Sequence, residues 1–188
     1  MAPRINKTLL AILLGAGALA GSGFVISNRH AQMVLVQAND GTVDRVHVGP
    51  LFNHDLIRLR DGVRMRLPLG ASHTMVIFLS GTECSNCLLE SRYWDKLTAS
   101  DPARLRVAAV LVNATDADRA AFLRGHATGY DVYRFADAGV EKSIGIGSAT
   151  PLKVLVDTRG RVKSAFGPTS NPQAQQRFYD LVHNAALR

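Results

Sequence analysis

The chain has 188 residues, with 22 Lys and Arg against 15 Asp and Glu and a formal net charge of +7. This length fits one domain with an appendage, and 47% apolar against 20% charged residues excludes a chain disordered by composition. Two cysteines are too few for a disulfide scaffold or a four-thiolate zinc site. The basic residues are scattered along the chain, so the charge does not indicate nucleic-acid binding.

The N-terminus has the pattern of an export signal. Two basic residues precede an uncharged stretch from Thr8 to Ile26, which is long enough to cross a bilayer as a signal anchor. The positive charge before it predicts that the rest of the chain is exported to the periplasm. The stretch also fits a signal peptide that is cleaved near Ala20, because Ala18-Leu19-Ala20 is a small-x-small cleavage site. Because Phe24 and its neighbours extend the apolar run past that site, we expect an uncleaved anchor in the inner membrane, with a soluble periplasmic form as the alternative.

The remainder of the chain alternates strand and helix patterns. We expect residues 1–27 to be the signal anchor or signal peptide, residues 28–47 a spacer and residues 48–188 the folded domain. The domain opens with a predicted β-hairpin around Asp61-Gly62. In chain order we then expect a buried strand at 75–79, helix 88–97, strand 107–112, helix 117–126 capped by Thr115 or Asp116, strand 132–135, helix 138–144, strands 152–156 and 162–166, and helix 170–187 with Phe178, Leu181, Val182 and Ala185 on its apolar stripe. This alternation predicts an α/β domain with a partly parallel sheet.

Cys84 and Cys87 form a C-x-x-C pair between the buried strand and the following helix. A helix start presents unpaired N–H groups and the positive end of the dipole, and both stabilise a thiolate. We therefore expect Cys84 to be the nucleophile. Cys87, one helical turn later, is placed to attack a mixed disulfide and release the substrate.

Three other interpretations of the cysteine pair remain open. It could be half of a zinc site, although no second C-x-x-C or H-x-x-x-H completes one. It could be two buried apolar thiols, although the neighbouring residues are polar. It could also be an inert disulfide, although so short a loop constrains the unfolded chain little.

The order of strand, C-x-x-C, helix and a later Thr-Pro before two strands and a final helix resembles the thioredoxin fold. The elements that carry the resemblance are VIFLSGTECSNC, residues 76–87, and ATPLKVLVDTRGRV, residues 149–162. More narrowly, the chain is similar to the membrane-anchored TlpA/ResA-type thiol–disulfide oxidoreductases, and more loosely to the MauD proteins. The fold implied is a mixed central sheet flanked by helices, with an N-terminal β-hairpin extension and an N-terminal hydrophobic segment.

This resemblance implies that Pro151 is a cis-proline beside the cysteines and that Thr150 offers its backbone to the substrate. It implies exported protein substrates with cysteines, such as apocytochromes c or another metalloprotein, and a thiol–disulfide electron donor in the membrane. No metal or organic cofactor is expected. The alternatives are a copper metallochaperone that holds Cu(I) on two thiolates, and a redox-inactive binding module with the same fold.

The motif departs from the thioredoxin pattern at Glu83, where thioredoxins usually have Trp. A carboxylate next to Cys84 opposes thiolate formation by like-charge repulsion, so Glu83 is predicted to modulate the pKa of that thiol. The couple is then expected to be a reductant, because neither His nor Pro stands inside the motif.

Overall fold

The computed structural model describes residues 24–28, 31–37, 43–47, 54–80, 85–125, 128–146, 150–167 and 172–187. Its largest element is a seven-stranded sheet in the order β10-β9-β6-β7-β8-β4-β5. The strands are β4 (Leu56–Arg58), β5 (Arg64–Met65), β6 (His73–Ser80), β7 (Leu105–Val112), β8 (Asp131–Phe135), β9 (Leu152–Asp157) and β10 (Val162–Phe166), and the helices are α2 (Ser85–Ser100), α3 (Asp116–Gly125), α4 (Ala138–Ile144) and α5 (Pro172–Leu187). β6, β7 and β8 are parallel and the other neighbours antiparallel, so the sheet is mixed, as predicted.

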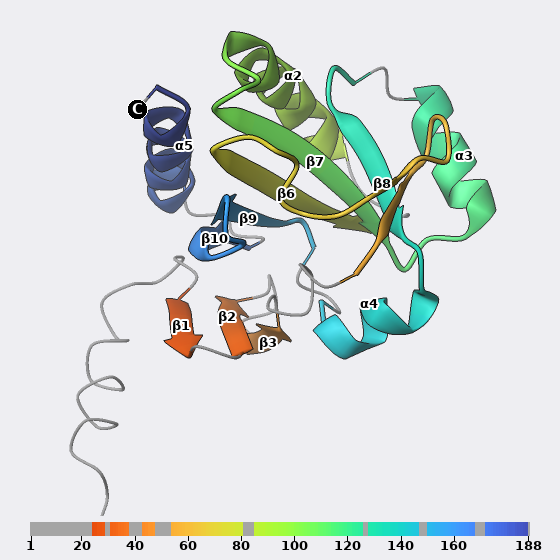
Figure 1. Cartoon of the computed structure of the whole chain (residues 1–188), viewed down its shortest axis with the longest axis horizontal. Coiled ribbons are helices and arrows are strands. Elements are labelled where there is room, and N and C mark those ends of the chain that lie inside the picture. Colours follow the sequence, from red (N-terminus) through yellow and green to blue (C-terminus); the bar gives the residue numbers. More distant parts are fainter. Residues whose placement is uncertain are drawn as a thin grey trace, which may run out of the picture.

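One face of the sheet is covered by α2, α3 and α5 (Figure 1). Ile77 and Leu79 of β6 pack there in one hydrophobic cluster with Trp94 of α2, Phe122 of α3 and Phe178 of α5. Because side chains alternate between the faces of a strand, every second residue of β6 belongs to this cluster. Both α2 and α5 are thereby held against the central strand.

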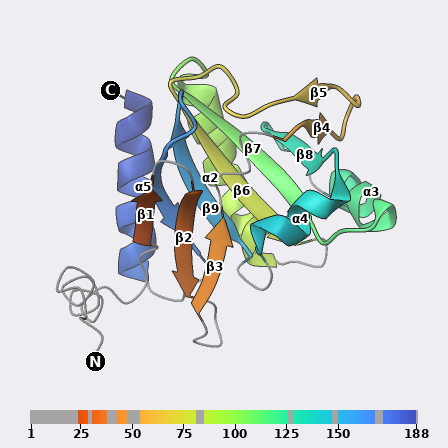
Figure 2. The same cartoon turned by 60° about the horizontal axis from the view of Figure 1, so that its bottom comes forward.

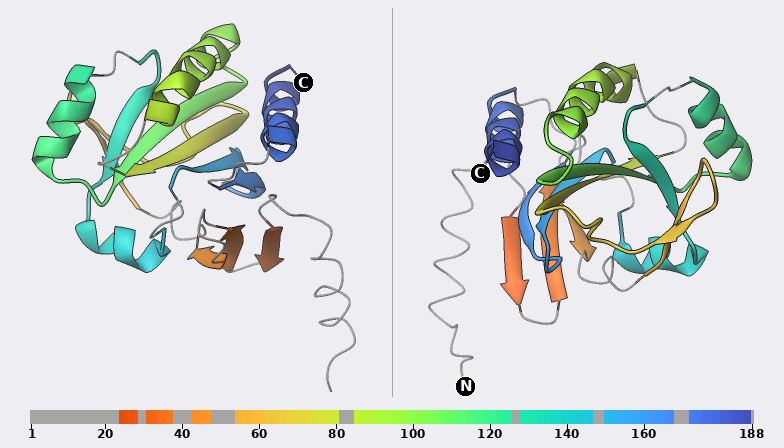
Figure 3. Two further views of the ribbon diagram at one scale, coloured as in Figure 1. Left: turned by 180° about the vertical axis from the view of Figure 1, so that it is seen from behind. Right: turned by 45° about the horizontal axis from the view of Figure 1, so that its top comes forward.

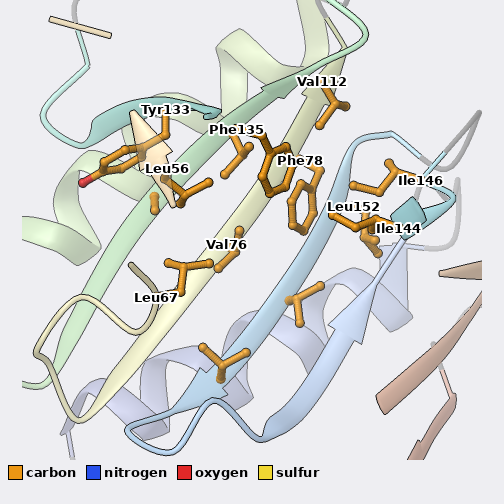
Figure 4. Packing of buried hydrophobic residues seen from close by; sticks show 14 of the residues in the cluster. Leu56, Leu67, Val76, Phe78, Val112, Tyr133, Phe135, Ile144, Ile146 and Leu152 are labelled. Atoms are coloured by element: carbon orange, nitrogen blue, oxygen red, sulfur yellow. The ribbon is translucent and has the colours of Figure 1, made fainter. Parts of the chain in front are cut away.

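The opposite face is covered by α4 and by loops (Figure 3). Figure 4 shows Val76 and Phe78 of β6 packed with Leu56, Ile144 and Leu152, and all five side chains are completely buried. β6 is therefore buried on both faces, as its unbroken apolar run predicts.

The predicted elements occur at the predicted places, with shifts of a few residues at their ends. Thr115, rather than Asp116, caps α3, because its Oγ1 accepts from the Asp118 N–H at 3.2 Å and the Asp118 carboxylate accepts from the Thr115 N–H at 2.8 Å. The predicted stripe of α5 is correct for Phe178, Val182 and Ala185, which pack in the hydrophobic cluster, but wrong for Leu181, which is 43% exposed. Successive residues of an α-helix are rotated by about 100° around its axis, so Leu181 points away from the buried side on which Val182 lies.

The predicted β-hairpin forms the edge of the main sheet. Leu56 of β4 pairs with Met65 of β5 on one side and with Phe135 of β8 on the other. Arg58 is fixed there by Asp61 at 2.7 Å and by Asp131 at 3.1 Å. The hairpin is thus an integral part of the domain.

A second, antiparallel sheet precedes the hairpin (Figure 2). It consists of β1 (Phe24–Asn28), β2 (Ala31–Gln37) and β3 (Val43–His47). β1 and β2 lie against β10, and β3 lies against α4. Residues 28–47, which we expected to be a spacer, thus hold two strands on either side of the turn sequence Asn39-Asp40-Gly41.

The predicted membrane anchor lies outside the described residues, except for its last three, which belong to β1. Across the described ranges, no helix combines the length and the apolar character that crossing a bilayer requires.

Asp157 organises the turn between β9 and β10. Its Oδ1 accepts from the N–H groups of Arg159 at 2.9 Å and Arg161 at 3.0 Å, and its Oδ2 lies 2.7 Å from the Arg161 guanidinium and 3.4 Å from Lys163 Nζ. Burial opposes ionisation of the carboxyl, but these donors outweigh it and lower its pKa to about 2. The turn therefore depends on a charged Asp157.

We expect Asp157→Asn to lower the free energy of unfolding by about 2 kcal/mol at pH 7, because an ordinary Asp titrates near pH 3.9 in the unfolded chain. A carboxyl with a depressed pKa stabilises the fold fully above the unfolded value. The difference between wild type and variant should therefore shrink as the pH falls from about 5 towards 2. Urea unfolding across this range measures it. Asp116→Asn, whose side chain is 95% exposed, serves as the control, and an equal loss in both variants would contradict the prediction.

Candidate active site

The structure describes only part of the predicted cysteine motif. Glu83 and Cys84 lie outside the described residues. Cys87 lies in the first turn of α2, and its side chain is outside the described part. α2 begins at Ser85, three residues earlier than predicted, so the helix start directly follows Cys84 in the sequence.

The sheet brings the predicted Thr-Pro segment to the end of β6 that leads into this motif. β6 and β9 pair antiparallel with Phe78 opposite Leu152, so the start of β9 lies beside the carboxyl end of β6. Thr150 and Pro151 immediately precede β9, and Thr150 is buried. The peptide bond between them is cis, as the resemblance implies.

A buried ion pair connects the cysteine helix to the same strand. Lys153 Nζ lies 2.7 Å from Glu90 Oε2, and the Lys153 side chain is 3% exposed and that of Glu90 23%. Glu90 stands three residues after Cys87 on α2, and Lys153 stands two residues after Pro151. The pair therefore joins the two segments that carry the predicted site.

The other oxygen of Glu90 is held by α5. Gln175 Nε2 donates to Glu90 Oε1 at 2.7 Å and lies 2.7 Å from Tyr179 Oη. Burial and the Glu90 carboxylate raise the pKa of Tyr179 well above its ordinary value. Both carboxylate oxygens of Glu90 are thus occupied by hydrogen-bond donors from other elements.

Aromatic rings surround the ammonium group of Lys153. Its Nζ lies 5.7 Å from the ring centre of Trp94, 5.2 Å from that of Phe166 and 5.9 Å from that of Tyr179. A cation within about 6 Å of an aromatic face is attracted by the ring quadrupole. These rings, from α2, β10 and α5, stabilise a positive charge at a position that is closed to solvent.

A small cavity lies beside the pair, between α2 and the sheet. It is lined by Ile77, Leu79, Glu90, Trp94, Tyr130, Pro151 and Lys153. It has room for roughly one water molecule. This cavity can hold a small polar molecule between the charged pair and Pro151, but not an organic cofactor.

Sequence reasoning missed Glu90 and Lys153. Residues 76–79, which lead into the cysteine motif, are all apolar, and the acid of the pair comes instead from α2. One signal was available, because Lys153 interrupts the otherwise apolar run LKVLV of a predicted strand. The partner could not be read from the sequence, since 63 positions separate the two residues.

Within the ranges that the structure describes, no three His, Cys, Asp or Glu side chains gather in a way that could hold an ion.

Comparison with solved structures identifies the architecture. An exposed lipoprotein thioredoxin of Streptococcus pneumoniae superposes with a TM-score of 0.53 at 17% identity, covering 66% of this chain and 95% of that one. The fold is thioredoxin-like. A secreted disulfide oxidoreductase of Mycobacterium tuberculosis, homologous to DsbE of E. coli, gives a TM-score of 0.53 at 15% identity and covers 71% of this chain and 95% of its own.

A third thioredoxin-like match extends over more of the chain. The thiol:disulfide interchange protein of the DsbE type from Chlorobium tepidum covers 89% of this chain and 98% of its own, with a TM-score of 0.50 and 17% identity. No protein-family model matches the sequence, and comparison with curated proteins gives no significant match. The predicted thioredoxin fold is confirmed, and the roles assigned to individual residues stay predictions.

The effect of Glu83 is one of these predictions. If its carboxylate lies near Cys84, Glu83→Gln should lower the pH midpoint at which Cys84 is alkylated, by up to about one unit, because a like charge is removed. Alkylation rates from pH 5 to 10 measure this in both proteins. Identical curves would show that Glu83 points into solvent and is screened.

Proposed function

We propose that the protein is an exported thiol–disulfide oxidoreductase that reduces disulfides of other exported proteins. The observation that carries this proposal is the placement of the Thr150-Pro151 segment beside the end of β6 that leads into the C-x-x-C motif. The thioredoxin-like fold of secreted and exposed oxidoreductases supports it.

The proposed reaction begins at Cys84. Its thiolate, stabilised by the N-terminus of α2, attacks one sulfur of a substrate disulfide, and the other substrate sulfur leaves as a thiolate that takes up a proton. Cys87 then loses its proton and attacks the Cys84 sulfur, which releases the second substrate thiol. The substrate gains two electrons and two protons, and the protein is left with a Cys84–Cys87 disulfide.

Thr150 and Pro151 are proposed to dock the substrate backbone next to the motif. A thiol–disulfide protein of the membrane is the proposed electron donor that reduces Cys84–Cys87 again. Cysteines of apocytochromes c, or of another exported metalloprotein, are the substrates that the resemblance suggests. The proposed reaction needs no metal or organic cofactor.

The domain is proposed to work in the periplasm. In the structure Phe24, Val25 and Ile26 pair with β2 instead of extending the leader. The uncharged leader outside the strand then spans residues 8–23, fewer than the about 20 that a membrane helix needs. This favours cleavage near Ala20 over an anchor in the inner membrane, and the mass of the mature protein distinguishes the two.

The test of the proposed function is reduction of insulin by the purified protein with a small dithiol as electron source, alongside Cu(I) titration of the reduced protein. Catalytic turnover without tight copper binding is the expected result. Stoichiometric tight copper binding without turnover would indicate a metallochaperone instead. If the protein shows neither turnover nor copper binding, the result would indicate a redox-inactive binding module.

A further inference from the structure

We propose that the outer edge of β5 binds an extended, acidic segment of a partner protein as an added strand. This binding function goes beyond the proposed reductase activity, because it uses no group of the cysteine motif. β5 forms one end of the seven-stranded sheet, and its hairpin lies on the side of the domain away from α5 and the second sheet (Figure 2). Strand addition at a sheet edge is a common way for a protein to bind an extended chain.

The two ends of the main sheet differ in what lies beside them. At one end, β10 lies against β1 and β2 of the second sheet. At the other end, β5 has a hydrogen-bonded neighbour on one side only among the residues that the structure describes. A strand with an open side presents N–H and C=O groups with which another chain can pair.

The hydrogen bonds of the hairpin indicate which backbone groups of β5 face outward. The Arg58 N–H donates to the Val63 carbonyl at 2.9 Å, so these two residues form a hydrogen-bonded pair. Hydrogen-bonded and non-hydrogen-bonded pairs alternate along an antiparallel ladder. Arg64, opposite Ile57, is therefore in a non-hydrogen-bonded pair, and its N–H and C=O groups point away from β4. The open side of β5 thus offers both a donor and an acceptor.

The same edge presents positive charge to solvent. The side chains of Arg64 and Arg66 are 70% and 68% exposed, and both approach Asp55, which is 32% exposed. Each guanidinium carries five N–H donors, so a single shared carboxylate leaves donors of both arginines available. Arg60, in the turn of the hairpin, adds a third guanidinium that is 64% exposed.

The two faces of the strand select different side chains in a partner. Side chains alternate along a strand, so Arg64 lies on one face and Val63 and Met65 on the other. Arg66 shares the face of Arg64, since both approach Asp55. Val63 is 44% exposed and is one of three large apolar side chains open to solvent in the described ranges. A matching segment therefore has acidic residues at alternate positions and apolar residues between them.

Other occupants fit this edge less well. A second copy of the chain would place arginine opposite arginine, and like charges directly across a strand pair are destabilising. Charged side chains commonly protect an edge strand against unselective pairing. Because they favour a chain of opposite charge and disfavour other chains, Arg64 and Arg66 select an acidic partner while they prevent self-association.

The experiment measures binding of a fluorescent peptide, Glu-Val-Glu-Val-Glu-Thr with both ends blocked, to the purified protein by fluorescence anisotropy. Arg64→Glu combined with Arg66→Glu should weaken binding at least about tenfold, because attraction becomes repulsion. The matched control combines Arg124→Glu with Arg177→Glu, two exposed positions on α3 and α5, and changes the net charge equally. The control should bind within about twofold of wild type, since distant surface charges are screened.

Peptides N-methylated at alternate residues test strand addition itself. They keep every charge, and alternate N–H groups of a strand face the same edge. Of the two alternately methylated peptides, one should therefore lose binding at least about tenfold and the other should retain it. Equal binding of the two would overturn the proposal, because it would leave only electrostatic adhesion.

Thermal unfolding checks that each variant is folded. If the double glutamate variant does not fold, Arg64→Gln combined with Arg66→Gln replaces it and should weaken binding at least about threefold. Absence of peptide binding by wild type, or unchanged binding by the folded variants, would overturn the proposal. Binding to phosphatidylglycerol vesicles without binding to the peptide would also overturn it, in favour of a membrane surface. None of these measurements depends on disulfide reduction.

Discussion

Cys84→Ser is expected to abolish disulfide reduction, whereas Cys87→Ser is expected to stop the reaction one step later. Without Cys84 no thiolate precedes α2 to attack the substrate, so the rate should fall to background, by on the order of a thousandfold or more. Without Cys87 the first attack still occurs, but the mixed disulfide cannot be resolved by the protein itself. The two serine variants, which differ from wild type by one atom each, therefore have different outcomes.

Insulin reduction and mass spectrometry of the protein after reaction measure these outcomes. The Cys87→Ser protein should accumulate a mixed disulfide, which is heavier than the free protein by the mass of one substrate chain. Dithiothreitol should remove this added mass. Cys84→Ser should form none. Trapping at Cys87 in the Cys84→Ser variant instead would reverse the assignment of nucleophile and resolving thiol, and full activity of both would refute it.

Leu56→Ala is expected to destabilise the protein by about 2–5 kcal/mol, through lost apolar burial and the cavity that remains. Leu56 is completely buried in the cluster under the hairpin, between Met65 and Phe135 in the sheet register (Figure 4). The loss should be this large only because β4 belongs to the main sheet and is not an independent extension.

Urea unfolding measures this loss, with Leu181→Ala as a matched control. Leu181 is the same residue type on α5 but 43% exposed, so its truncation should change stability by no more than about 0.5 kcal/mol. A small effect of Leu56→Ala would mean that the hairpin edge can open without disturbing the core.

Much of the fold could be predicted because its signals are local. The apolar run that became β6 and the Thr115 cap of α3 each depend on neighbours within a few residues. The order of C-x-x-C and Thr150-Pro151 indicated the thioredoxin topology, because the two motifs occur in the right sequence of strands and helices.

The interior of the site could not be predicted, because it is made by contacts between distant segments. The pairing of Glu90 with Lys153 joins α2 to β9, and the aromatic enclosure adds α5 and β10. The exposure of Leu181 likewise depends on which part of α5 faces the sheet. Residues 28–47 carried strand and turn signals, but those signals did not reveal that the segment packs against β10 and α4.

The reduction potential of the Cys84–Cys87 couple tests the proposed function most directly, and equilibration with glutathione or dithiothreitol buffers measures it. A reversible two-electron couple is predicted, in which about 30 mV corresponds to a tenfold change in the ratio of oxidised to reduced protein. Its potential should lie nearer the reducing value of about −270 mV, typical of thioredoxin, than the oxidising value of about −120 mV. A pair of cysteines that forms no reversible disulfide under these conditions would contradict the proposed function.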